Sequence, residues 1–244
     1  MFLKLATIAL IPALLVQGYQ VKKNTPRLAE ALGERNGLVG NGPQISILIL
    51  GDSAAAGVGV QFQEDALSGT LLQELRDHFQ IRWSLIAKTG NRTSDVIRTI
   101  QAINDDQFDI VVTSIGVNDI TQLISPQKWI CLQEQLYSLI AEKFSPKLII
   151  ATGVPPMNDF PALPNPLAWL FGKYAHQMNV ELENWIEPQP KFELVKYDLD
   201  EYKQLNLKMA EDGFHPSKEI YQLWAKKISS IIQNHFRSKS QTEI

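Results

Sequence analysis

The most constraining feature of this chain is an alternation of short, largely apolar runs with longer segments of helical periodicity. Five runs rich in Ile and Val lie at residues 45–50, 82–87, 110–115, 148–152 and 192–197. Runs of this kind are typical of parallel strands whose two faces are both buried. The pattern therefore predicts an α/β fold, a three-layer α/β/α sandwich built on a mainly parallel, five-stranded sheet.

Amphipathic helices are expected between and after these strands. Residues 67–79 and 96–103 each carry one apolar stripe, and residues 220–232 give the clearest helical pattern in the chain. Residues 127–143 are expected to form a helix that Ser125 caps. In such a fold the functional residues collect at the carboxyl ends of the strands.

The N-terminal segment stands apart from this pattern. Within residues 1–19 the only charged side chain is that of Lys4. An apolar stretch of this length is typical of a signal peptide or a short membrane anchor, so we expect export or membrane association. Positive charge on both sides, at Lys4 and then at Lys22 and Lys23, leaves the side of the membrane open. The alternative is an apolar helix that lies against the folded domain.

The rest of the chain divides into three expected parts. Residues 20–43 are rich in Gly, Pro, Asn and charged residues, which is typical of a linker. The folded domain is expected at residues 44–237, and a polar tail at residues 238–244. A chain of 244 residues has room for one large α/β domain of this kind.

Charge and cysteine content argue against several classes of function. The chain has 23 Lys and Arg against 26 Asp and Glu, and a net charge of −3 offers no overall electrostatic attraction for nucleic acid or for an anionic membrane. The single cysteine, Cys131, has no partner for a disulfide bond, and we expect it to be a small buried residue of a helix. No complete dinucleotide-binding, Walker A or zinc-protease motif is present in the sequence, so we expect neither a cofactor nor a metal.

A candidate nucleophile follows the first predicted strand. The sequence Gly51-Asp52-Ser53 comes directly after residues 45–50, and the small residues that follow allow a helix to start close behind the serine. A serine at such a turn is exposed at the edge of the sheet, and its N–H points toward a developing oxyanion. The alternative is an ordinary loop or helix-capping serine, because this tripeptide alone is not specific.

A serine hydroxyl needs a base, and the base needs a group that orients it. Residues 212–216, Asp-Gly-Phe-His-Pro, supply both within one turn, so that Asp212 can reach Nδ1 of His215 and leave Nε2 for Ser53. The glycine and the proline favour a turn over a continuing helix. An Asp-Gly turn without catalytic meaning is the alternative, and Glu211 is a second carboxylate at a less apt spacing.

Oxyanion donors are expected after the second and third predicted strands. Residues 116–119, Gly-Val-Asn-Asp, place the uncharged amide of Asn118 at the end of the third strand. After the second strand, Gly90 allows a backbone N–H to approach a substrate closely. Asn118 is also explained as a turn residue, and Gly90 as a simple breaker. The candidate positions nevertheless all fall where a single site can form.

Together, these motifs resemble the four sequence blocks of the GDSL/SGNH hydrolase superfamily in order and spacing. The blocks are Gly51-Asp52-Ser53, Gly90, Gly116-Val117-Asn118-Asp119 and Asp212-Gly213-Phe214-His215-Pro216. The resemblance implies a flavodoxin-like fold and a triad of Ser53, His215 and Asp212. It further implies an oxyanion hole from the N–H groups of Ser53 and Gly90 and the amide of Asn118, with no metal.

We therefore expect a serine hydrolase that cleaves carboxylic esters through an acyl-enzyme on Ser53. Ala54 stands where the family name has leucine, which leaves the substrate class open between small-molecule and lipid esters. Residues 155–171 combine prolines with large apolar side chains, so they either wall the site for an acyl chain or pack in the core. Membrane contact is expected through residues 1–19, and the oligomeric state is left open.

Two other functions fit the same residues. An acyltransferase would use the same serine and pass the acyl group to an alcohol in place of water. A non-catalytic, membrane-tethered binding module would keep the fold without the reaction. The second alternative is disfavoured because all the proposed catalytic elements are retained.

Overall fold

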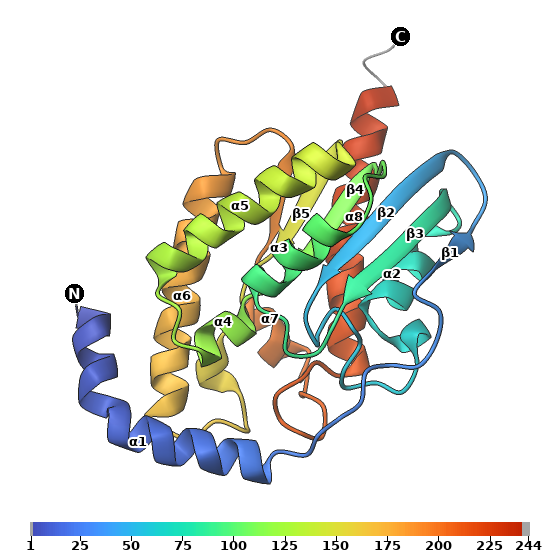
Figure 1. Ribbon diagram of the computed structural model, residues 1–244. Helices are drawn as coiled ribbons and strands as arrows, with labels where there is room; N and C mark the ends of the chain where they lie inside the picture. Colours follow the sequence, from blue (N-terminus) through green and yellow to red (C-terminus); the bar gives the residue numbers. More distant parts are fainter. Residues whose placement is uncertain (1, 241–244) are drawn as a thin grey trace.

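The computed structural model describes residues 2–240 and has three layers, with one sheet between two groups of helices (Figure 1). The strands are β1 (Asn36–Val39), β2 (Gln44–Gly51), β3 (Gln80–Ala87), β4 (Ile110–Ser114), β5 (Leu148–Thr152) and β6 (Phe192–Val195). The α-helices are α1 (Phe2–Asn24), α2 (Leu67–Leu75), α3 (Thr93–Ala102), α4 (Val117–Thr121), α5 (Pro126–Phe144), α6 (Leu167–Ile186), α7 (Leu199–Gln204) and α8 (Lys218–Ser240). Two short 3-10 helices are η1 (Gln63–Asp65) and η2 (Met157–Asp159). The predicted α/β/α sandwich is confirmed.

The sheet has six strands in the order β1-β3-β2-β4-β5-β6, so the predicted count of five is wrong by one. Strands β2 to β6 are parallel, as predicted, whereas β1 pairs antiparallel with β3. The extra strand lies inside residues 20–43, the expected linker. Its four residues are mostly exposed at the edge of the sheet, so they carry no apolar run that would have predicted a strand.

Helices cover both faces of the sheet, which explains why the strands are apolar without a break. Leu48 and Leu50 of β2 pack on the side of α3, α5 and α6, whereas Ile47 and Ile49 pack on the side of α2 and α8. Neighbouring side chains of a strand point to opposite faces, and all four of these residues are buried. The parallel crossovers consequently place the loops after β2 to β6 at a single edge.

The helices differ from the predicted ones mainly at their ends. Helix α2 ends at Leu75, so the apolar stripe predicted at residues 67–79 continues beyond the helix. Helix α8 continues to Ser240, into the segment expected as a polar tail. Residues 241–244 of that tail, and Met1 of the N-terminal segment, lie outside the described residues.

Cys131 lies on α5, as expected, but it is exposed, so the prediction that it is buried is wrong. The cause is the helical period. The face of α5 that packs into the domain is formed by Trp129, Gln133, Leu136, Tyr137, Ile140 and Phe144. Position 131 falls outside that face, and the polar residue Gln133 is buried instead.

The N-terminal helix α1 lies against the folded domain along α6. It is bent in Figure 1, and Pro12, which lacks an N–H and kinks helices, lies within it. Among the described residues, α1 is the one helix that is long and apolar enough to cross a membrane. By composition α1 is therefore consistent with a signal or a membrane anchor, and its packing matches the alternative of an apolar helix against the domain.

Candidate active site

The turn after β2 presents Ser53 at the carboxyl edge of the sheet. Gly51 ends β2 beside β4, where a Cβ atom would clash with the carbonyl oxygen of Ser114. Asp52 then shapes the turn, because its Oδ1 accepts the N–H of Ala54 at 3.0 Å. Only glycine fits the first of these positions, and the carboxylate holds the chain that follows the serine.

The residues after Ser53 form successive turns and not the helix that the sequence predicts. Gly57 and Gly59 have φ angles of 82° and 107°, which a right-handed helix does not allow. Helix α2 begins only at Leu67. A helix dipole therefore does not begin directly behind the serine, and any stabilisation of an oxyanion on this side comes from the N–H groups of the turn.

The loop before α8 brings His215 and Asp212 to Ser53. Nε2 of His215 lies 2.9 Å from Oγ of Ser53, and its Nδ1 lies 2.5 Å from Oδ2 of Asp212. The other carboxylate oxygen of Asp212 accepts the N–H groups of Phe214 and His215, each at 2.9 Å. Gly213 allows this tight turn with a φ of 63°. The three residues predicted as a triad thus form one continuous hydrogen-bonded chain.

Two buried carboxylates lie close to Ser53 in contrasting surroundings. Burial opposes the charge of Asp212, but the hydrogen bonds from His215 and its loop outweigh burial and hold the pKa of Asp212 below its usual value. Burial raises the pKa of Asp52 to about 7. Glu211, the other carboxylate considered, is exposed. Within residues 2–240, no group of three or more His, Cys, Asp or Glu side chains could hold a metal ion.

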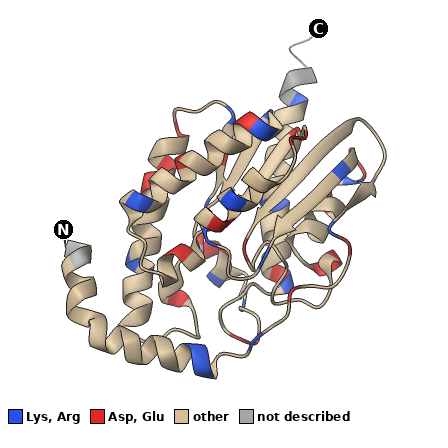
Figure 2. Ribbon diagram, in the orientation of Figure 1, with Lys and Arg blue, Asp and Glu red and all other residues tan. Residues whose placement is uncertain are grey.

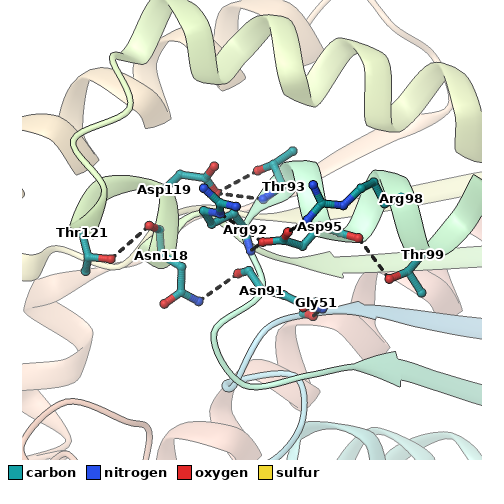
Figure 3. A network of polar contacts seen from close by, with 10 residues as sticks. All are labelled: Gly51, Asn91, Arg92, Thr93, Asp95, Arg98, Thr99, Asn118, Asp119 and Thr121. Carbon is teal, nitrogen blue, oxygen red and sulfur yellow. Dashed lines mark hydrogen bonds and ion pairs between the residues drawn. The ribbon is translucent and has the colours of Figure 1, made fainter.

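The expected oxyanion donors lie in two further loops. Gly90, with a φ of 85°, follows β3 in open space, since a Cβ atom there would meet nothing within 4 Å. In the described part of the chain, the N–H groups of Ser53 and Gly90 donate no hydrogen bond. The side-chain amide of Asn118, on α4, donates one N–H to the carbonyl oxygen of Asn91 at 2.9 Å (Figure 3). Because an amide has two N–H groups, a second donor is left on Asn118.

A buried polar network joins the first residue of α3, directly after the loop that follows β3, to α4 (Figure 3). Oδ2 of Asp119 accepts the backbone N–H of Thr93 at 3.0 Å and its hydroxyl at 2.9 Å. Nε2 of Gln133, on α5, donates to the same hydroxyl at 3.0 Å. Burial raises the pKa of Asp119 even though Thr93 donates two hydrogen bonds to it. The network fixes Asn118, next to Asp119, relative to the loop that carries Gly90.

A cavity of about 180 Å³ with mainly apolar walls opens beside Ser53 and His215. The loops after β4, β5 and β6, helices α7 and α8 and the loop between these helices line it, with Ile115, Val154, Phe160, Tyr197, Tyr202, Met209, Phe214 and Trp224 among the lining residues. The rings of Phe160 and Phe214 meet edge to face, with centroids 5.1 Å apart.

The segment at residues 155–171 divides between the two roles considered for it. Its first part contributes Pro155, Pro156, Asp159 and Phe160 to the wall of the cavity. Its last part begins α6 and packs in the core. Sequence reasoning could not assign these roles, because large apolar side chains occur in both parts and fit a cavity wall as well as a core.

Known proteins similar to this chain share its fold. A family model described as the GDSL-like lipase/acylhydrolase family matches residues 49–223. Among solved structures, a member of the lipolytic G-D-S-L family from Veillonella parvula has 15% identity and a TM-score of 0.63, over 77% of this chain and 98% of that chain. No curated protein sequence matches the chain.

Two further solved structures carry enzyme names. A psychrotrophic esterase from Pseudoalteromonas sp., inhibited by monoethylphosphonate, has 20% identity and a TM-score of 0.57, over 79% of this chain and 98% of that chain. An extracellular lipase from Streptomyces rimosus has 15% identity and a TM-score of 0.59, over 76% of this chain and 99% of that chain. At these identities the similarity shows a shared fold.

Proposed function

This chain belongs to the GDSL-like lipase/acylhydrolase family, and from that premise we propose that it hydrolyses carboxylic esters through an acyl-enzyme on Ser53. It is a carboxylic ester hydrolase of the lipolytic type. In the proposed reaction Ser53 is the nucleophile, His215 is the general base and Asp212 orients the base. The matched residues 49–223 include all three.

The contact between Ser53 and His215 is the observation that carries this proposal. At 2.9 Å, Nε2 of His215 accepts the hydroxyl proton while Oγ of Ser53 attacks the carbonyl carbon of the ester. The imidazolium then protonates the departing alcohol, and the acyl group stays on the serine. A water molecule, deprotonated by the same nitrogen, next releases the acid and restores Ser53. Asp212 holds the tautomer in which Nε2 is free to act as a base.

The tetrahedral intermediate carries a negative oxygen that needs donors. The proposed donors are the N–H groups of Ser53 and Gly90 and the remaining N–H of Asn118. Their support is the open space around Gly90 and the network that fixes Asn118. Fixed donors of this kind stabilise a transition state because they need no reorganisation during the reaction.

The cavity beside Ser53 is the proposed site for the acyl group. Its walls are mainly apolar, which favours an aliphatic or aromatic acyl chain over a charged one. The protein is proposed to be either exported or associated with a membrane through α1, because that helix has the length and hydropathy of a signal or an anchor.

A series of p-nitrophenyl esters of increasing acyl length tests the reaction. The native protein is expected to release p-nitrophenol in a burst, and Ser53→Ala is expected to lose several orders of magnitude in turnover. Ser230→Ala, at an exposed position of α8, is the matched control and should behave as the native protein. Native turnover in Ser53→Ala would refute the nucleophile. Transfer of the acyl group to an added alcohol in preference to water would indicate an acyltransferase.

A further inference from the structure

Helix α1 has an inner stripe that fits the folded domain. Its residues follow one another at alternating intervals of four and three, which is one face of a helix: Leu3, Thr7, Leu10, Leu14, Gln17 and Val21. Leu3 and Leu14 are buried, and the hydroxyl of Thr7 lies 3.1 Å from that of Tyr174 on α6. The amide of Gln17 bonds the carbonyl oxygen of Asn165 at 2.6 Å and the N–H of Leu167 at 3.1 Å.

The opposite face of α1 has an outer stripe that nothing in the structure covers. It consists of Leu5, Ile8, Ile11, Leu15, Val16 and Tyr19, which are 44% to 70% exposed. These six are half of the twelve large hydrophobic residues that are exposed within the described part of the chain. A contiguous apolar patch of this kind marks an interaction surface, whereas scattered exposed residues do not.

The charges around the outer stripe indicate a lipid surface. No charged residue lies between Leu5 and Tyr19, whereas the exposed Lys22 and Lys23 follow directly at the end of the helix (Figure 2). Helix α1 as a whole is long enough to cross a bilayer, but its uncharged part, the 17 residues from Leu5 to Val21, measures about 26 Å at about 1.5 Å each, somewhat less than the roughly 30 Å of a bilayer core. The inner stripe is moreover occupied by α6, so only one side of the helix can enter lipid. The helix is apolar on both faces, and it is the packing of the inner stripe on α6 that leaves a single exposed apolar side along its length. An apolar side exposed along the whole helix can enter lipid only if the helix lies in the plane of the membrane surface.

The position of α1 relates this surface to the proposed active site. In Figure 1, α1 runs along the end of the molecule to which the carboxyl ends of the strands point. Gln17 binds Asn165 and Leu167, at the start of α6. The segment just before these two residues contains Phe160, which lies in the wall of the cavity. That same segment is tied to the catalytic loop, because the N–H of Ala162 donates to the carbonyl oxygen of Gly213 at 3.1 Å.

We propose that α1 docks in the plane of an anionic phospholipid surface through its outer stripe, so that the cavity beside Ser53 receives ester substrates from the membrane. The proposal rests on the proposed esterase function and names its substrate class, lipid-borne amphiphilic esters. The apolar stripe enters the boundary between headgroups and acyl chains, and Lys22 and Lys23 contact the anionic headgroups. The helix remains bound to α6 throughout.

Flotation of the full chain with vesicles, combined with two hydrolysis assays, tests this proposal. The vesicles consist of phosphatidylcholine alone or with phosphatidylglycerol, and the substrates are a soluble short-chain p-nitrophenyl ester and a long-chain ester embedded in the vesicles. Leu15→Glu is expected to weaken vesicle binding and hydrolysis of the embedded ester by about tenfold or more. Hydrolysis of the soluble ester should stay within about twofold of the native rate, because Leu15 faces away from the domain.

Leu38→Glu is the matched control, since Leu38 is 66% exposed on β1, away from α1. It should bind vesicles and hydrolyse both esters as the native protein does. Joint replacement of Lys22 and Lys23 by Gln should remove the preference for phosphatidylglycerol. Native vesicle binding by Leu15→Glu, or a native dimer that Leu15→Glu dissociates, would overturn the membrane proposal. If the native protein does not hydrolyse the soluble ester, the esterase function is refuted, whether or not the protein binds vesicles.

Discussion

The two sides of Ser53 are built in different ways. On the His215 side, the proposed base and its carboxylate are three residues apart, and one glycine turn places both. On the Asn118 side, the proposed oxyanion donors come from segments far apart in the sequence. There, Asn118 is held through Asn91 and through the buried network behind it.

This difference teaches which kind of change each side tolerates. The His215 side depends on few contacts, so removal of one of them should affect the reaction directly. The Asn118 side distributes its geometry over several buried hydrogen bonds, so a single loss should be smaller and should appear partly as lost stability. The predictions that follow test this contrast, beginning with the largest effect.

Asp212→Asn should cause the largest loss. The variant keeps the shape of the side chain but allows the wrong tautomer of His215, which in serine proteases lowers turnover by about 10⁴. Steady-state kinetics on a soluble ester measure the effect. Glu211→Gln, one position earlier and exposed, is the control and should be neutral. An Asp212→Asn enzyme with native turnover would remove Asp212 from the triad.

Asn118→Ala should cost about 10² to 10³ in turnover, which is the usual effect of losing one oxyanion donor. The Michaelis constant should change little, because the donor acts on the transition state. A variant that loses affinity while it keeps native turnover would show that Asn118 binds the ground state. If Asn118→Ala and Asp212→Asn lowered turnover by the same factor, this result would contradict the contrast between the two sides.

Thr93→Val should have a smaller effect that combines activity and stability. The substitution keeps the shape of the side chain but removes a hydroxyl that contacts both Asp119 and Gln133. The buried groups left without a partner should cost about 1 to 3 kcal/mol of unfolding free energy, measured by urea denaturation. Turnover should fall by about tenfold, and Thr93→Ser should restore both. Unchanged stability would show that the network does not hold this side.

Asp52→Asn should change turnover least but should change how stability depends on pH. Burial raises the pKa of Asp52 from its ordinary value of 3.8 to about 7, so between these pH values the folded protein holds a proton on Asp52 that the unfolded chain has lost. Its contribution to the unfolding free energy is therefore complete below about pH 4 and decreases as the pH rises to about 7. The unfolding free energy of Asp52→Asn, relative to that of the native protein, should therefore increase between about pH 4 and pH 7 and stay constant above about pH 7. Urea denaturation at a series of pH values measures this, and a difference that does not vary with pH would contradict it.

The part of the molecule that sequence predicts best is the part with local causes. The apolar runs predict β2 to β6, and the spacing of Asp212 and His215 predicts their contact, because each depends on neighbours in the chain. Strand β1 escapes prediction because it is only four residues long, mostly exposed and on the edge of the sheet. The exposure of Cys131 depends on the rotation of α5 relative to the core, which composition alone does not give.

The network on the Asn118 side could not be predicted for a related reason. Thr93 and Gln133 are separated by 40 residues, and each is an ordinary polar residue in its own segment. The one local signal is Asp119, a charged residue directly after Asn118 and shortly after the buried strand β4. Its burial, with 1% of its surface exposed, is a result of tertiary packing.

Covalent labelling tests the central claim, the activation of Ser53 by His215 and Asp212, most directly. The native protein is treated with an alkyl fluorophosphonate, which reacts with activated serines, and the modified residue is identified by peptide mass spectrometry. We predict a phosphonyl adduct on Ser53, none on Ser53→Ala, and strongly slowed labelling of Asp212→Asn. An adduct on another serine, or a native protein that hydrolyses esters while Ser53 stays unlabelled, would contradict the account.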